Sequence, residues 1–179
     1  MVEAGTEAIG LYFTHVVAEK IRPLLRPGGR VLDFGDRRGR VALHLEAAGV
    51  RVARHHEGAP ASDAERPFGG AFAEVHDWPA ARAGTRGLAE SLEPGAPVLV
   101  RLLRRPGQTP AAVTRDLGSE FAFGTTASLG LLVPSEAQAG WAEQHPHVFA
   151  ALCALEGLVR DWPGLRRAGR ESMLVGVRR

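Results

Sequence analysis

The chain has 179 residues, and 22 lysines and arginines against 20 acidic residues give it a formal net charge of +2. This length is that of one domain with a substantial core, so we expect residues 1–179 to form a single domain. A hydrophobic share of 45% is ordinary for a soluble globular protein. Because the charges are nearly balanced and spread along the chain, the composition predicts no nucleic-acid partner.

The cysteine content and the first residues of the chain further limit the cellular compartment and the kinds of metal site that we expect. Cys153 is the only cysteine, which excludes a disulfide framework and a cysteine-based metal site. The stretch "MVEAGTEAIGLYFTHVV" carries acids where a signal peptide would carry bases, and no apolar run is long enough to span a membrane. We therefore expect a soluble, cytoplasmic, bacterial-type protein without a bound metal or a membrane contact.

The first third of the chain alternates helical and strand patterns. Apolar residues at helical spacing predict an amphipathic helix over about 7–25, within an N-terminal segment 1–27, and the turn "RPGG" ends it. A buried strand is predicted at 30–34. A helix then runs over 38–48 and ends at a glycine, and a second strand follows at 50–55.

The middle of the chain continues the alternation after a long loop. Residues 57–70 are rich in glycine, proline, serine and aspartate, which predicts a loop. Strand patterns at 71–76 and within 93–103 flank a predicted helix at 79–92. A short helix is predicted at 109–117.

The last third contains one ambiguous stretch. Residues 119–147 are long for a connection, and we expect them to form a lid over a substrate or an interface. A helix is predicted from Val148 to Trp162, and "ESMLVGVRR" reads as a terminal strand.

Strands that alternate with helices predict an open, mostly parallel sheet with right-handed crossovers. Such sheets bind ligands beyond the carboxyl ends of their strands. This arrangement gathers residues 34–39, 55–57 and 76–78 at one edge of the sheet, which is where a site is expected.

Four stretches together resemble one enzyme family. They are "LRPGGRVLDFGDRRGRVALHLEAAGVRV", "PFGGAFAEVHDWP", "LAESLEPGAPVLVRL" and "ESMLVGVRR". The first looks like the opening strand–loop–helix of class I S-adenosylmethionine-dependent methyltransferases, and the others resemble later strands of that family. The resemblance implies a three-layer, Rossmann-like open sheet, mostly parallel with an antiparallel C-terminal strand, and S-adenosylmethionine as cofactor.

The loop after the first strand carries the cofactor motif implied by the resemblance, with one departure. The family pattern is an acid followed by three glycines at alternate positions, and Asp33, Gly35 and Gly39 match it. Arg37, next to Asp36, replaces the middle glycine. Its guanidinium would point toward a pocket for a cationic sulfonium, or would pair with the carboxylate of the cofactor.

Two further positions for the cofactor are implied after the second strand. The acid that binds the ribose in the family falls on His56, with Glu57 beside it as the alternative. Asp63 matches an acid that commonly meets the adenine amine. The structural alternative for His56 and Glu57 is an exposed loop.

The same interval is too short for the family's usual helix and third strand. A helix of about three turns and a strand of five or six residues, with their loops, do not fit into 57–70. We therefore expect a sheet that lacks the strand-three unit and an adenosine site that lacks one wall. The second strand would lie at the sheet edge, where Arg51 and Arg54 fit the charged protection expected of edges.

The stretch "HDW" lies where the family often holds substrate-contacting groups. His76 is a candidate base, Asp77 a candidate orienting group and Trp78 a candidate stacking face for a substrate. The structural alternative is that Asp77 caps the following helix and Trp78 packs against it.

The charged loop from Asp36 to Arg40 allows a second kind of site. Arginines at a helix N-terminus favour an anion such as a phosphometabolite, and the alternative is a solvated charged turn.

The departures from the family pattern are Arg37 in the glycine loop, His56 in place of the ribose-binding acid and the missing strand-three unit. They favour a methyltransferase-like domain with a degenerate S-adenosylmethionine site, which acts without catalysis as a binding or partner module. The alternative is an active S-adenosylmethionine-dependent methyltransferase on an unidentified small molecule. A homodimer or protein partner is expected at the edge of the second strand or at 119–147.

Overall fold

The structure is a computed structural model of the chain. It describes residues 2–35, 39–55, 67–78, 81, 87–103, 108–134, 138–165 and 168–179.

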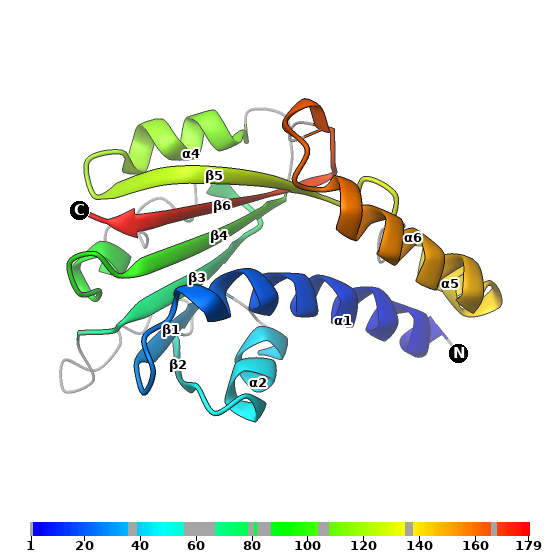
Figure 1. Cartoon of the computed structure of the whole chain (residues 1–179), viewed down its shortest axis with the longest axis horizontal. Coiled ribbons are helices and arrows are strands. Elements are labelled where there is room, and N and C mark those ends of the chain that lie inside the picture. The colour runs from blue at the N-terminus through cyan, green and yellow to red at the C-terminus, as the bar shows by residue number, and fades with distance from the viewer. Residues whose placement is uncertain are drawn as a thin grey trace.

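Helices and strands alternate along most of the chain (Figure 1). The α-helices are α1 (Val2–Ile21), α2 (Arg40–Ala47), α4 (Pro110–Leu117), α5 (Ala139–Gln144) and α6 (Pro146–Val159). Among the described residues, 3₁₀ helices are η1 (Arg22–Leu24) and η4 (Pro163–Leu165). The strands are β1 (Arg30–Phe34), β2 (Arg51–His55), β3 (Gly70–Val75), β4 (Pro97–Leu103), β5 (Phe121–Leu129) and β6 (Glu171–Arg178). Helical residues are also described at 78, 81 and 87–90.

The strands form a six-stranded sheet in the order β2-β1-β3-β4-β6-β5. The pairs β1–β2, β1–β3 and β3–β4 are parallel, whereas β6 runs antiparallel to both β4 and β5. The predicted mostly parallel sheet with an antiparallel C-terminal strand is therefore confirmed. Within the described residues β2 has a strand neighbour on one side only, as expected for a sheet without the strand-three unit.

One face of the sheet packs against α1 and α2. Four residues at the helical spacing predicted from the sequence are at most 3% exposed: Phe13, Val16, Val17 and Ile21. Leu24, predicted to continue that stripe, is 44% exposed because α1 ends at Ile21 and a 3₁₀ turn containing a proline follows.

The opposite face packs against α4 and the helical residues before β4. The buried side chains on this side include Leu32, Ala71, Trp78, Leu88 and Val113. Successive strand residues point to opposite faces. The two cores on either side therefore make the sheet the middle of three layers.

Residues 121–129 differ from the expectation for 119–147. They form β5, which pairs along β6, so this part of the segment completes the sheet and is not a lid. The alternation of apolar and polar residues that would predict this strand is interrupted. The pairing shifts register between Phe123 and Thr125, around Gly124, and such an irregularity breaks the period of two.

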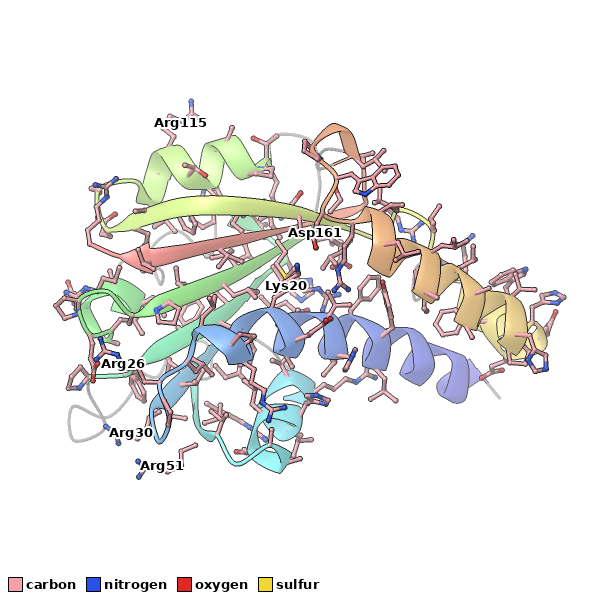
Figure 2. All side chains as sticks on the ribbon, in the orientation of Figure 1. Lys20, Arg26, Arg30, Arg51, Arg115 and Asp161 are labelled. Carbon is pink, nitrogen blue, oxygen red and sulfur yellow. The ribbon has the colours of Figure 1, made fainter. Side chains whose placement is uncertain are left out.

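The exposed edge strand β2 carries two arginines. The Arg51 guanidinium donates to the carbonyl of Gly28 at 2.8 Å, in the turn before β1. In Figure 2, Arg51 lies near Arg30 at the end of the molecule where β1 and β2 begin. This placement agrees with a charged edge that discourages further strand pairing.

Ion pairs connect α1 to the segment after α6. Lys20 and Asp161, which are labelled near each other in Figure 2, form an ion pair at 2.7 Å, and Nη2 of Arg160 lies 2.8 Å from Oε2 of Glu19. Among the described residues, no helix combines the length and apolar character needed to cross a membrane.

Candidate functional site

The loop after β1 contains two glycines in conformations that other residues rarely adopt. Gly35 has φ +92°, and a Cβ added there would lie 2.6 Å from the carbonyl oxygen of Glu74 on β3. Gly39 has φ +61° and is the N-cap of α2. A Cβ on Gly39 would lie 3.0 Å from Nη1 of Arg54. Gly35 is therefore required by its positive φ and by the backbone of β3, whereas Gly39 is favoured by its positive φ and has a flexible arginine side chain beside it.

Asp33 stands just before this loop on β1. It is 2% exposed, and it lies on the face of the sheet that packs against α1 and α2, as Val31 does two residues earlier. Its register partner on β2 is Arg54, so both side chains project from the same face. The acid predicted from the sequence is thus buried at the carboxyl end of β1.

A chain of charged groups crosses the neighbouring strands on the same face. The Arg101 guanidinium of β4 donates to both carboxylate oxygens of Glu171 on β6, from Nε at 2.5 Å and from Nη2 at 3.0 Å. Its Nη1 lies 3.3 Å from Oε2 of Glu74 on β3. Oε1 of Glu74 is in turn 2.9 Å from Nε2 of His76. The guanidinium also lies 5.0 Å from the ring centroid of Phe13, so α1 covers it.

This chain of charged groups is mostly sheltered from water. The side chains of Arg101, Glu74 and Glu171 are 17%, 18% and 11% exposed, whereas that of His76 is 50% exposed. A guanidinium held between two carboxylates fixes both acids in place by charge-assisted bonds. His76 is therefore the end of the chain that a molecule from solvent can reach.

The carboxylate beside His76 differs from the one predicted. The sequence offers Asp77 as a candidate orienting group, with helix capping as the alternative, whereas the carboxylate that the structure describes at Nε2 of His76 is that of Glu74. Asp77 is exposed, and its carbonyl accepts a hydrogen bond from the Ala81 amide at 3.0 Å. That bond is the first of a helix, which agrees with the capping alternative for Asp77.

Comparison with solved structures reveals extensive similarity at low sequence identity. The chain is similar to the CcbJ methyltransferase from Streptomyces caelestis, with a TM-score of 0.61, 12% identity, and coverage of 94% of this chain and 96% of that one. For the [4+2]-cyclase SpnF the TM-score is 0.55 at 17% identity, with coverage of 92% and 79%. For the Burkholderia thailandensis 1,6-didemethyltoxoflavin-N1-methyltransferase, solved with S-adenosylhomocysteine, the TM-score is 0.53 at 15% identity, with coverage of 99% and 79%.

The chain has the fold of class I methyltransferases. No protein-family model matches the sequence, and no curated protein matches it either. The resemblance noted in the sequence is thus confirmed at the level of the fold. In this methyltransferase fold, the carboxyl ends of β1, β2 and β3 meet at one edge, as predicted, and Gly35, Gly39 and His76 lie there.

Trp78 does not present the stacking face predicted for it. The side chain is 4% exposed in the core beneath α4, and its indole Nε1 donates to Oδ2 of Asp116 at 2.9 Å. An indole enclosed in this way has no face open to a substrate. The contacts agree instead with the packing role given as the alternative.

Gln108 is a residue near the site that the sequence does not point to. It is 4% exposed, its Oε1 accepts from the Trp78 amide at 2.8 Å, and its Nε2 donates to the Leu103 carbonyl at 2.5 Å. It therefore ties the ends of β3 and β4 together beneath the edge of the sheet. A single glutamine in a loop carries no sequence signal for such a role, whereas Glu74 and Arg101 stand out as charges within apolar strands.

The remaining predicted site residues lie outside the described residues: Asp36, Arg37, His56, Glu57 and Asp63. In the described part of the chain no cluster of three or more His, Cys, Asp or Glu side chains is arranged to hold a metal ion.

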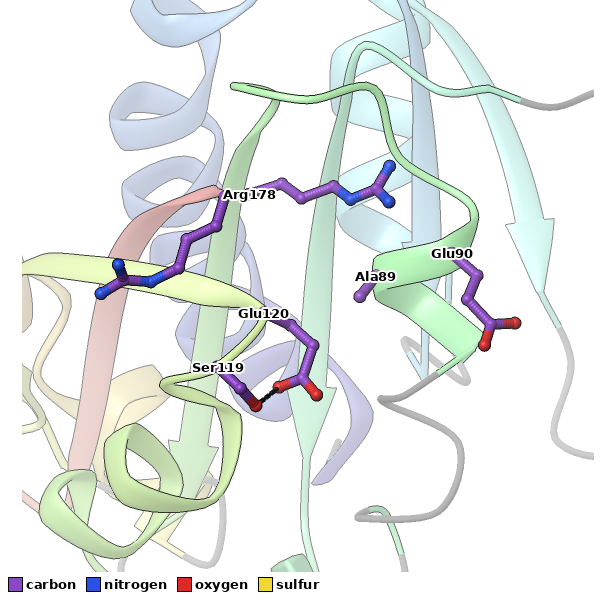
Figure 3. Close-up of a pocket in the computed structure, with 6 residues that line it drawn as sticks. Ala89, Glu90, Ser119, Glu120 and Arg178 are labelled. Atoms are coloured by element: carbon purple, nitrogen blue, oxygen red, sulfur yellow. Dashed lines mark hydrogen bonds between the residues drawn. The ribbon is translucent and has the colours of Figure 1, made fainter.

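A shallow hollow of about 360 Å³ lies at the opposite edge of the sheet, where β6 ends beside the start of β4 (Figure 3). Glu90, Ser119, Glu120 and Arg178 are among its lining residues. The Glu120 carboxylate accepts a bond from Ser119 Oγ at 2.6 Å, and the Arg178 guanidinium donates to the Leu92 carbonyl. This hollow is separate from the loop glycines and from His76.

Proposed function

We propose that this chain is a methyltransferase-fold domain whose S-adenosylmethionine site is degenerate and which acts as a binding or partner module without methyl transfer. The observation that carries the proposal is the contact between Arg54 and Gly39. A loop glycine allows a ligand to approach the backbone closely, and here the guanidinium of Arg54 stands in that space, 3.0 Å from where a Cβ would be.

The position of Arg54 also opposes the cofactor electrostatically. Gly39 is the N-cap of α2, so the guanidinium lies at the positive end of a helix. Glu46 offsets this cost, because its Oε2 is 3.3 Å from Nη2 of Arg54. A sulfonium brought to the same place would meet a further positive charge, and Arg54 would have to leave its partner to admit it.

The shape of the sheet supports the same proposal. β2 lies at the edge within the described residues, and only residues 56–69 connect it to β3. That interval is too short for a helix of about three turns, a strand of five or six residues and their loops. An adenosine at this edge would therefore lack a wall, and with it much of the burial that a ligand of this size needs. On these grounds the described residues do not fit the cofactor.

The alternative function is an active methyltransferase that takes S-adenosylmethionine and a small-molecule acceptor. It is favoured by the buried acid Asp33 at the end of β1 and by the half-exposed His76 held by Glu74. His76 would be the proton acceptor in that case, because it is the reachable end of the charged chain.

Anion binding at the loop from Asp36 to Arg40 remains a prediction. Of its arginines the structure describes Arg40, whose guanidinium packs against Gly10 of α1. The predicted partner sites at the edge of β2 and at 119–147 likewise remain predictions.

Titration calorimetry with S-adenosylhomocysteine, together with thermal melting, tests the proposal. We expect neither heat nor a shifted melting temperature for the natural sequence at about 1 mM ligand. Saturable binding with a Kd below about 1 mM would overturn the proposal.

Two variants isolate the contact at Gly39. Arg54→Ala removes the guanidinium from the loop and should bring binding into the measurable range. Arg51→Ala is the matched control, since it removes an arginine from the same strand that bonds to Gly28 instead. If Arg54→Ala binds S-adenosylhomocysteine no better than the Arg51→Ala control, the Arg54 contact does not prevent cofactor binding. The proposal then loses its main support.

A further inference from the structure

Helix α6 has an unusual distribution of charge. Among its fourteen residues, Pro146–Val159, Glu156 is the only aspartate, glutamate, lysine or arginine, and a histidine, His147, lies in the first turn. Glu156 is 0% exposed, so the carboxylate of the helix points into the protein. The surface that α6 turns to solvent beyond its first turn therefore carries no charged group.

The buried carboxylate fixes which face of α6 points outward. Oε1 of Glu156 accepts a hydrogen bond from the Gly130 amide at 2.8 Å, and Oε2 accepts from the amides of Leu132 and Val133, each at 2.9 Å. These three bonds attach the helix to the turn after β5. A rotation of α6 that buried its apolar surface would break all of them, at a cost that charge-assisted bonds make large.

The outward face is apolar along most of the helix. Val148, Leu155 and Leu158 are 49%, 50% and 71% exposed, and they follow one another at helical spacing. The exposed residues between them are small: Ala150, Ala151, Ala154 and Gly157. We call these seven residues the α6 face.

The position of α6 leaves this face accessible. Figure 1 shows α5 and α6 continuing past the ends of the strands, beside the N-terminal part of α1. On the inner side of α6, Phe149 and Cys153 pack on the core beneath α1. Exposed contiguous apolar patches of this kind mark interaction sites in soluble proteins.

We propose that the α6 face binds the α6 face of a second copy of this chain, so that the protein forms a two-fold symmetric dimer. A two-fold interface brings the same patch of both subunits together, so an uncharged, apolar patch is complementary to itself. The two helices would run antiparallel. The small residues Ala151 and Ala154, near the middle of the face, allow their axes to approach to about 8 Å.

Other occupants suit this face less well. Helices that lie on membranes carry lysines and arginines on their polar side, and α6 has neither residue. A charged peptide would lose its hydration against the α6 face without gaining an opposite charge. A second copy brings no such charge.

The area of the face agrees with a dimer of modest affinity. The exposed fractions of Val148, Leu155 and Leu158 correspond to about 300 Å², and the exposed alanines and Gly157 raise the area of the face to about 500 Å² in each copy, in the range of the largest patches on soluble proteins. Two copies would bury about 1,000 Å², which is close to the lower limit for a specific interface. The dimer should therefore depend on concentration in the micromolar range.

Sedimentation velocity from about 1 to 200 μM tests the proposal without any ligand, so its outcome does not depend on the proposed function. We expect a concentration-dependent shift from monomer to dimer. The double variant L155E/L158E should stay monomeric throughout that range, because dimerisation would bury its carboxylates. The control L43E places the same change on α2, where Leu43 is 57% exposed, and should still dimerise. Circular dichroism checks that each variant is folded.

Cross-linking identifies the surface. In a Cys153→Ser background, Ala151→Cys should form an intermolecular disulfide on mild oxidation, whereas Ala47→Cys on the exposed side of α2 should not. A natural sequence that is monomeric at about 200 μM would overturn the proposal. A dimer that L155E/L158E leaves intact would overturn it as well, as would α6-dependent binding to neutral lipid vesicles by a monomer.

Discussion

Replacing Glu156 should strongly destabilise this protein, because its buried carboxylate is the shared acceptor of three backbone amides. In Glu156→Ala, the amides of Gly130, Leu132 and Val133 lose that acceptor. Gly130 and Val133 are buried, so their N–H groups cannot turn to water, whereas Leu132 is 42% exposed. Two buried unsatisfied donors and the loss of a charged acceptor together cost about 3–5 kcal/mol.

The predicted loss is large relative to the stability of a domain of this size, which is about 5–15 kcal/mol. At about 2–4 °C per kcal/mol, the melting midpoint should fall by about 6–20 °C. Glu156→Gln keeps one acceptor oxygen and replaces the other by a donor, so its loss should be smaller. Urea unfolding followed by circular dichroism measures both.

Glu90→Ala is the control, because Glu90 is exposed and its removal should change stability by less than about 0.5 kcal/mol. If Glu156→Ala unfolds at the same urea concentration as the control, the three bonds do not hold the turn after β5. The argument that Glu156 fixes the outward face of α6 would then fail too.

Three other changes are predicted from the same structure. Gly35→Ala should cost about 1–3 kcal/mol more than Gly49→Ala in urea unfolding, because both sites have positive φ but only at Gly35 would the Cβ meet backbone, 2.6 Å away. Arg101→Met should cost about 2–3 kcal/mol, since it leaves two partly buried carboxylates side by side, and an added Glu171→Gln should recover part of that loss. Burial, and secondarily the Glu156 carboxylate, raises the pKa of Cys153 from 9.0 to about 11. The stability gained from this neutral thiol is therefore complete below pH about 9 and disappears as pH rises through about 11, so the urea midpoint should fall less over this range in Cys153→Ser.

Most of the fold follows from local patterns. The strand predicted at 30–34 has the same bounds as β1. The strands β2 and β6 differ from their predictions by one residue at one end, and β3 is shifted by one residue at both ends. Each of these strands is a short apolar run with turn residues on both sides, so the sequence indicates both that the run is a strand and where it ends. The strand β5 is not predicted from the sequence, because Gly124 and a register shift interrupt its alternation of apolar and polar residues. Its pairing with β6 is also a long-range contact, which local patterns do not reveal.

The site follows from sequence only in part. Position along the chain places Gly35, Gly39 and His76 at one edge of the sheet, since parallel strands end together. It does not reveal that Glu74 is the carboxylate at His76, or that Trp78 is enclosed beneath α4. Both outcomes depend on which face of the sheet a side chain occupies, and a single-residue change of register exchanges those faces.

The loop glycines also show why a retained motif is weak support for a retained ligand. Gly35 must stay glycine in this fold whether or not a cofactor binds, because the Glu74 carbonyl on β3 leaves no room for a Cβ. Gly39 is constrained by its positive φ and by the neighbouring guanidinium. A chain that lost its cofactor would therefore keep both glycines. The residue beside Gly39, Arg54, is under no such backbone constraint, so it is more informative about ligand binding than the glycines are.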